Sequence, residues 1–155
     1  MPTIREANES DLLHLLSIAE RYDEDAQDWD WYEKLDGKWI CLNLMTAIHD
    51  PNQCVLTAWE EDKLVGVYWA FMSLQAMAPI YITRNNFFYV LPKYRTFDIA
   101  RGMMRYIEEW SDWRGSKLMA IGCNFSADPK QNRAAELLHK RAGYQSFGVD
   151  YIKRL

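Results

Sequence analysis

The chain has 155 residues, enough for one domain with a single hydrophobic core. Hydrophobic residues make up 49% of it and charged residues 26%, which excludes a disordered or collagen-like chain and is typical of a soluble globular protein. The formal net charge of −4 argues against nucleic-acid binding through the phosphate backbone, since such a protein presents a basic face.

The first half of the chain predicts a strand, two helices and a hairpin. In chain order, we expect a strand at residues 3–7, a helix from residue 10 onward, a second helix within 31–48 and a turn at 50–52. Two strands of a hairpin follow, at 54–59 and 64–71. The first helix follows Ser10-Asp11, a capping pair, and has apolar residues at spacings of three and four. Gly37 weakens the second helix because glycine is a poor helix former.

The second half alternates strands and helices. We expect a loop at residues 76–79, a strand at 81–90, a helix at 98–113 and a strand at 117–123. A helix at 132–142 follows, and then two short final strands around Gly148, within 144–155. The helix at 98–113 has apolar residues expected on one face: Ile99, Met103, Ile107, Trp110 and Trp113. Gly115 and Gly143 are positioned to end the two helices.

Together these elements predict a mixed α/β (α+β) domain over residues 1–155. The hairpin makes the middle strands antiparallel, and the later strand–helix–strand unit indicates a parallel pair joined by a right-handed crossover. We therefore expect three layers, with a mixed, mostly antiparallel central sheet and helices on both of its faces.

The cysteines and the N-terminus indicate the compartment. Cys41, Cys54 and Cys123 lack the spacing of a metal site, so we expect no metal, and their odd number fits a reducing compartment. The polar N-terminus lacks the apolar core of a signal peptide, and no apolar run reaches the roughly 20 residues of a membrane span. We expect a cytoplasmic protein without membrane contact.

The stretch LPKYRTFDIARG, residues 91–102, connects a predicted strand to a predicted helix. A helix N-terminus presents unpaired N–H groups and the positive end of a dipole, which together bind phosphate. Three basic residues would add positive charge nearby: Lys93, Arg95 and Arg101. The alternative is an ordinary connection in which Thr96 or Asp98 caps the helix.

The stretch YVLPKYRTFDIARGMM resembles the acetyl-CoA-binding segment of the GNAT family of N-acetyltransferases, V-x-P-x-Y-R-G-x-G-I-G, with matches at Val90, Pro92, Tyr94, Arg95, Ile99 and Ala100. The C-terminal stretch NRAAELLHKRAGYQSFGVDYIKRL resembles the last motif of that family, with matches at Asn132, Ala135, Leu138, Gly143, Tyr151, Lys153 and Leu155. The start, TIREANESDL, resembles the family's first strand and helix. The resemblance therefore covers nearly the whole chain and implies a GNAT-like fold. The spacing of Arg95, Ile107-Glu108 and Trp110 also resembles family members encoded by bacteriophages.

Two residues depart from the family pattern, because Thr96 and Asp98 replace glycines of the phosphate-binding loop. A threonine is tolerated if its φ angle stays negative, since its hydroxyl can itself donate to a phosphate. A carboxylate beside a pyrophosphate is repelled by about 1 kcal/mol or more at a few ångströms. Either Asp98 turns away, caps the helix or pairs with Arg101 or Lys93, or the cofactor site is weak or lost.

The resemblance implies that acetyl-CoA is the acyl donor and that the Val90 amide polarises its thioester carbonyl. It also implies a contact from Asn132 and a phosphate contact from Arg133. The expected cofactor-binding residues are Tyr89, Val90, Arg95, Thr96, Phe97, Asp98, Ile99, Ala100, Asn132 and Arg133.

The expected catalytic residues are His139 and Tyr144. His139 stands where the family usually has a tyrosine that acts as the general acid, and its imidazolium could protonate a leaving thiolate. The alternative is a surface histidine on an amphipathic helix. Tyr144 and Tyr89 are rival acids or packing aromatics. No carboxylate lies on the strand at 82–90, so the base must be a water chain or a carboxylate from residues 23–33.

An acidic and aromatic segment lies where this family builds its substrate wall: Asp28, Trp29, Asp30, Trp31 and Tyr32. These side chains could hold a cationic amine by charge and by cation–π contact. The alternative is a solvated acidic face above buried tryptophans.

The sequence thus favours an acyl-CoA-dependent N-acyltransferase that moves an acetyl group from acetyl-CoA to a primary amine, a small polyamine-like molecule or a lysine side chain, by direct attack in a ternary complex. One alternative is a catalytically inactive binding or assembly module of the same fold. Another is a phage acyltransferase, working in the host cytoplasm, that acts on a modified nucleobase or a host protein. The sequence leaves monomer and homodimer open.

Overall fold

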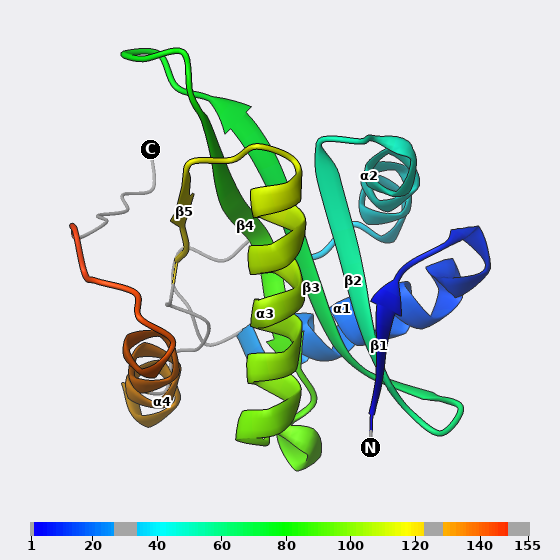
Figure 1. Cartoon of the computed structure of the whole chain (residues 1–155). Helices are drawn as coiled ribbons and strands as arrows, with labels where there is room; N and C mark the ends of the chain where they lie inside the picture. Colours follow the sequence, from blue (N-terminus) through cyan, green and yellow to red (C-terminus); the bar gives the residue numbers. More distant parts are fainter. Residues whose placement is uncertain (1, 27–33, 123–128, 149–155) are drawn as a thin grey trace.

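Figure 1 shows a twisted sheet with helices on both faces, and the computed structural model describes residues 2–26, 34–122 and 129–148. Among these residues the sheet has five strands in the order β1-β2-β3-β4-β5. Their bounds are Thr3–Glu6 for β1, Gln53–Glu60 for β2, Lys63–Leu74 for β3, Tyr81–Val90 for β4 and Leu118–Ala120 for β5. The helices are α1 (Leu12–Ala26), α2 (Gly37–His49), α3 (Phe97–Trp113) and α4 (Pro129–Arg141), with short 3₁₀ turns at Glu9–Asp11 and Pro92–Tyr94.

Strands β1 to β4 pair antiparallel, and β5 pairs with β4 in parallel. This confirms the mixed, mostly antiparallel sheet and the parallel pair that the sequence predicts. The predicted hairpin is β2–β3, whose turn contains Glu61 at a φ angle of 53°. The pairing of β3 with β4 skips Asn86, which forms a bulge in β4.

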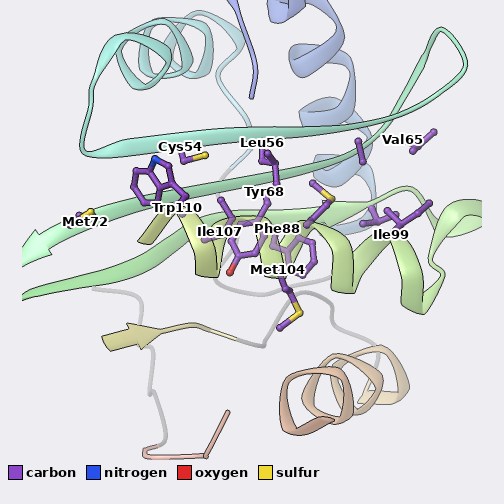
Figure 2. Close-up of a cluster of buried hydrophobic side chains, with 14 residues drawn as sticks. Cys54, Leu56, Val65, Tyr68, Met72, Phe88, Ile99, Met104, Ile107 and Trp110 are labelled. Atoms are coloured by element: carbon purple, nitrogen blue, oxygen red, sulfur yellow. The ribbon is translucent and has the colours of Figure 1, made fainter. Parts of the chain in front are cut away.

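The core lies in two apolar clusters, one on each face of the sheet. One cluster packs β2, β3 and β4 against α3, and Figure 2 shows its side chains, with the rings of Tyr68 and Phe88 stacked at 4.4 Å. The other packs α1 and α2 against the opposite face, through Leu15, Leu44 and Trp69 among others. The three predicted layers are therefore confirmed.

Side-chain caps set where the helices begin. Asp36 caps α2 by accepting hydrogen bonds from the amides of Lys38 and Trp39 at 2.9 and 3.0 Å. Gly37, which is expected from the sequence to weaken this helix, is its first residue and does not lie in its interior. Gly115 and Gly143 follow the ends of α3 and α4 with φ angles of 83° and 91°, so both predicted stops are confirmed.

Three expectations need correction. Trp113 is 79% exposed and does not share the buried face of α3, of which it is the last residue. Strand β5 is shorter than the predicted 117–123. Residues 144–148 contain no strand, and the rest of the expected C-terminal strands lies outside the described residues.

Candidate functional site

Strand β5 ends about halfway along β4. Their pairing ends at Arg84 and Ala120, and beyond it the side chain of Asn85 takes the place of backbone pairing. Its Oδ1 accepts a hydrogen bond from the Gly122 amide at 2.9 Å, and its Nδ2 donates to the Gly122 carbonyl at 3.5 Å. The remainder of β4, up to Val90, therefore has one backbone edge without a strand partner among the described residues.

The last peptide group of β4 points to this open edge. The Leu91 amide donates to the Val65 carbonyl of β3 at 2.9 Å. Because successive residues of a strand direct their peptide groups to opposite edges, the N–H and C=O of Val90 point away from β3. The Val90 carbonyl accepts a hydrogen bond from Nε of Arg95 at 2.8 Å, which leaves the Val90 N–H as a donor toward the open edge.

The connection after β4 brings the N-terminus of α3 to the same place. Thr96 caps α3, with its Oγ1 accepting from the Ile99 amide at 3.4 Å and a φ angle of −100°. Within the described ranges, Glu61 is the only non-glycine residue with a positive φ angle, so neither Thr96 nor Asp98 strains the backbone in place of glycine. The other amides of the first helical turn can serve as donors at the positive end of the helix dipole.

A cavity of about 390 Å³ lies between the end of β4, the first turn of α3 and α4. It brings together seven of the predicted residues: Tyr89, Val90, Arg95, Thr96, Phe97, Ala100 and His139. Much of the remaining wall is apolar, through Phe88, Ala134 and Leu138. A long, narrow, mostly apolar group with an anionic end is the kind of ligand that this cavity and helix terminus fit.

Arg95 joins three elements at the cavity. Besides its bond to Val90, its NH1 donates to Oε1 of Gln131 on α4 at 2.6 Å, and its NH2 lies 3.4 Å from Oδ2 of Asp25 on α1. Its guanidinium also lies over the Tyr89 ring, 5.3 Å from the ring centre. The other two basic residues of the predicted phosphate loop do not line the cavity, and Arg101 pairs with Glu108 at 2.9 Å.

Tyr89 contributes a hydroxyl to this arrangement. It donates to Oδ2 of Asp25 at 2.5 Å. Burial, together with the Asp25 carboxylate, raises the pKa of Tyr89 well above its ordinary value, so the phenol stays protonated. Asp25 comes from the segment 23–33 that the sequence names as a source of the base, and it is partly exposed.

His139 is 3% exposed and lines the cavity from α4, so it is not a surface histidine. Its Nδ1 donates to the Ala135 carbonyl at 2.7 Å, because a carbonyl can only accept. Burial lowers the pKa of His139 below its usual value, against the opposing effects of that hydrogen bond and of Glu108. The resting imidazole is therefore neutral at physiological pH.

Tyr144 does not line the cavity. Its ring meets the edge of His139 at 5.4 Å between centres, and its hydroxyl donates to Oε1 of Glu108 at 3.2 Å. Tyr144 therefore contacts His139, and of these two residues only His139 lines the cavity.

Other predicted residues lie elsewhere. Ile99 is buried in the core, and Asn132 and Arg133 are on α4 without lining the cavity. Asp98 is exposed in the first turn of α3, and no ion pair joins it to Lys93 or Arg101 in the part of the chain that the structure describes. The predicted substrate residues, 28–32, lie outside the described residues.

Sequence reasoning missed Gln131 and did not single out Asp25. Both reach Arg95 from helices far away in the chain, and no local motif marks either of them. Within residues 2–26, 34–122 and 129–148, no three His, Cys, Asp or Glu residues gather as metal ligands. None of the described helices is both long and apolar enough to cross a bilayer.

A sequence model of the acetyltransferase (GNAT) family matches residues 10–144 of the chain. That range contains β4, the connection to α3, and α4, which are the elements that form the cavity. A search of the curated proteins gives no match.

Solved structures share the fold over the length of the chain. A ribosomal-protein-alanine N-acetyltransferase from Brucella melitensis biovar Abortus 2308 has a TM-score of 0.74 at 14% identity, with 99% of each chain covered. An aminoglycoside acetyltransferase from an uncultured soil metagenomic sample has a TM-score of 0.77 at 13% identity, covering 100% of this chain and 99% of that one. The enzyme AAC(6')-Iy, in complex with a bisubstrate analogue of CoA and acetylneamine, has a TM-score of 0.72 at 16% identity, covering 100% and 99%.

At these identities the likeness shows the fold, and it confirms the GNAT-like architecture that the sequence resemblance implies. The descriptions of these structures do not mention bacteriophages, so the phage-type assignment finds no support.

Proposed function

Since the chain belongs to the GNAT family of acetyltransferases, we propose that it moves an acetyl group from acetyl-CoA to a primary amine by direct attack in a ternary complex. One observation carries this proposal: the outward N–H of Val90 and the first-turn amides of α3 adjoin a single, mostly apolar cavity. This arrangement offers one donor for a carbonyl oxygen and several for phosphate.

Bound acetyl-CoA would supply an acetyl group activated as a thioester. The residues that would hold it are those of the loop and of α4: Tyr89, Val90, Arg95, Thr96, Phe97, Asp98, Ile99, Ala100, Asn132 and Arg133. Asp98 would contribute its backbone amide, since its exposed side chain lies outside the cavity lining. Val90 would direct its N–H to the thioester oxygen, where negative charge develops during attack.

The amine must lose a proton before or during attack, and we assign this task to Tyr89 and Asp25. The Tyr89 hydroxyl can accept a proton from the amine while it passes its own proton to Asp25, to which it is already hydrogen-bonded. The amine is then neutral, the phenol is unchanged and the carboxylate carries the proton. Arg95 lies beside the same carboxylate oxygen and helps to hold the Asp25 side chain in place.

His139 acts on the side of the leaving thiolate. With Nδ1–H bonded to Ala135, the neutral ring can take at Nε2 the second proton, which the attacking nitrogen loses as the amide forms, and give it to the leaving sulfur. This differs from a resting imidazolium acid, which burial disfavours. Tyr144 positions His139 by its edge-on ring contact and is not itself the acid.

The acceptor is a primary amine, with a small polyamine-like molecule and a lysine side chain as the candidates from the sequence. Similar folds occur in proteins named for acetylating aminoglycosides and a ribosomal protein. Residues 28–32 stay a proposed part of the acceptor wall. Two observations support the competing proposal, a non-catalytic binding module. Asp98 places a carboxylate at the phosphate loop, and Arg95 already has three hydrogen-bond partners.

Calorimetric titration with acetyl-CoA separates the two proposals, together with an assay of thiol release on a panel of amines. Micromolar binding and amine-dependent thiol release are the expected results. Binding without release from any amine would support the module. If neither the wild type nor Asp98→Gly binds acetyl-CoA, the acetyltransferase proposal fails.

A further inference from the structure

A second cavity, of about 330 Å³, lies on the face of the sheet that α1 and α2 cover, between these helices and the strands β3 and β4. Its volume falls at the lower end of the roughly 300–1,000 Å³ that small-molecule sites occupy. Its walls are aromatic and aliphatic apart from Lys34, Asp36 and Asn86.

Aromatic rings line this cavity on several sides. Tyr22 comes from α1, Trp39 from α2, Trp69 from β3 and Phe87 from β4. Trp39 is 66% exposed although it is a large apolar side chain, and it also borders a neighbouring hollow of about 470 Å³. An exposed tryptophan at the edge of an apolar cavity is a contact surface that a ligand would cover.

Neighbouring residues of β4 line the two cavities. Phe87 lines the second cavity and Tyr89 the first, and residues two apart on a strand share one face. The ring of Tyr22 meets both of them edge-on, at 4.9 Å from Phe87 and 5.6 Å from Tyr89. Tyr89 in turn donates to Asp25, so the aromatic wall ends at a carboxylate.

The polar groups of the second cavity do not suit a polycation or a polyhydroxylated sugar. Oδ1 of Asp36 already accepts two backbone hydrogen bonds, and Lys34 is itself a cation. Lys34, Asp36 and Asn86 are too few to pair with all the amines and hydroxyls of a polyamine or an aminoglycoside, and each such group buried without a partner costs about 1–3 kcal/mol. An apolar ring has no polar groups to leave unpaired, and its transfer from water into the cavity is favourable.

We propose that the acceptor is a primary amine carried on an apolar, ring-sized body, with the body in the cavity walled by Tyr22, Trp39, Trp69 and Phe87 and the amine at Tyr89 and Asp25. This inference rests on the proposed function and narrows its substrate class. It gives Trp39 the role of a specificity-determining residue, which acts on acceptor binding.

The test compares 2-phenylethylamine with spermidine and neamine at saturating acetyl-CoA, by the rate of thiol release. We expect kcat/KM for 2-phenylethylamine to be highest by about tenfold or more, the factor that a ring's worth of apolar contact supplies. Trp39→Ala should raise KM for 2-phenylethylamine about tenfold with little change in kcat. Trp113→Ala is the matched control, since Trp113 is equally a helical, exposed tryptophan and lines none of the described cavities named above.

Equal or better use of spermidine or neamine overturns the inference, and so does a Trp39→Ala variant that behaves like Trp113→Ala. Acetyl-CoA binding is measured separately in all three proteins and should be the same. If no amine is acetylated, calorimetry with 2-phenylethylamine alone decides: binding that Trp39→Ala weakens supports the acceptor cavity although the proposed activity has failed, and no binding overturns it.

Discussion

The Tyr89 hydroxyl donates a hydrogen bond to Oδ2 of Asp25 at 2.5 Å, which joins β4 to the last turns of α1 across 64 residues of sequence. Arg95 approaches the same oxygen at 3.4 Å and also binds α4 through Gln131. The proposed base and the loop that would hold the donor are therefore parts of one hydrogen-bonded group. Substitutions in that group should therefore reduce the catalytic rate more than they reduce the stability of the fold.

Removing the Tyr89 hydroxyl should slow the reaction while acetyl-CoA still binds. Tyr89→Phe keeps the ring contacts with Tyr22 and Arg95 but breaks the route from the amine to Asp25. We expect kcat to fall by roughly 10- to 100-fold, the range of a lost general base, and Asp25→Asn to show the same loss. Steady-state kinetics from pH 6 to 9 and calorimetry with acetyl-CoA measure the two effects.

Tyr106→Phe is the matched control, because it removes a hydroxyl that donates to Glu6 at 3.1 Å, near β1 and outside the cavity. Its kcat should equal that of the wild type. If Tyr89→Phe keeps full kcat but binds acetyl-CoA more weakly, then the Tyr89–Asp25 pair supports the cofactor loop and is not the base.

The charge of Asp98, and not the absence of glycine, should limit cofactor affinity. The φ angle of Thr96 is negative and Asp98 lies inside the helix, so the loop needs no glycine conformation. Asp98→Asn and Asp98→Gly should therefore tighten acetyl-CoA binding equally, by roughly two- to fivefold for an exposed, screened carboxylate. Asp98→Gly should also lower the free energy of unfolding by about 1 kcal/mol, since glycine is a poor helix former.

Asp112→Asn serves as the control for net charge, because Asp112 is exposed near the other end of α3, roughly 20 Å away at 1.5 Å per residue. It should leave the Kd for acetyl-CoA unchanged. A large gain in affinity for Asp98→Gly alone would show that the backbone freedom of glycine matters after all. High salt should reduce the effect of Asp98→Asn.

Elements with a strong periodic signal could be predicted from the sequence, and their ends less well. Strand 81–90 has the bounds that the apolar run indicates, between a turn and a proline. Trp113 continues the apolar period of α3, but a periodic pattern does not say where the buried face of a helix ends. Gly37 indicates a weakened helix from the sequence alone, but in the structure Asp36 caps a helix that begins at Gly37.

The site was predictable only where it is local. Val90, Arg95, Thr96 and Ala100 lie within one connection, so a single motif names them together. Gln131 reaches Arg95 from 36 residues away and Asp25 reaches Tyr89 from 64. Such pairings depend on how helices cross the sheet, and amphipathic spacing does not encode the partner of an individual polar side chain.

Protonation of His139 should destabilise the fold. Burial lowers its pKa in the folded protein below the unfolded value of about 6.5, so the unfolded chain binds more protons as the pH falls through that value. The free energy of unfolding should therefore drop between pH 7.5 and 5.5. In His139→Asn, whose amide can still donate to the Ala135 carbonyl, that part of the pH dependence should be missing. Urea denaturation at several pH values measures it, and an unchanged slope in the variant would contradict the assignment.

The ion pair of Arg5 and Asp11 should stabilise the N-terminal strand against α1. Asp11 is 3% exposed, receives two hydrogen bonds from Arg5 at 2.7 and 2.8 Å, and accepts a third from the Asn8 amide. Asp11→Asn removes the carboxylate partner of the guanidinium and should lower the free energy of unfolding by about 2 kcal/mol at pH 7, less than for a fully buried pair because Arg5 is partly exposed.

The same pair should give a defined pH dependence. The hydrogen bonds from Arg5 lower the pKa of Asp11 in the folded protein, so its contribution is fully present above the unfolded value of about 3.9 and is lost as the pH falls below it. The difference between wild type and Asp11→Asn should therefore stay constant from pH 7 to 5 and shrink toward pH 3. Glu9→Gln, which breaks the exposed pair of Glu9 with His49, should change stability by less than about 0.5 kcal/mol. A loss for Glu9→Gln as large as that for Asp11→Asn would mean that burial does not set the strength of these pairs.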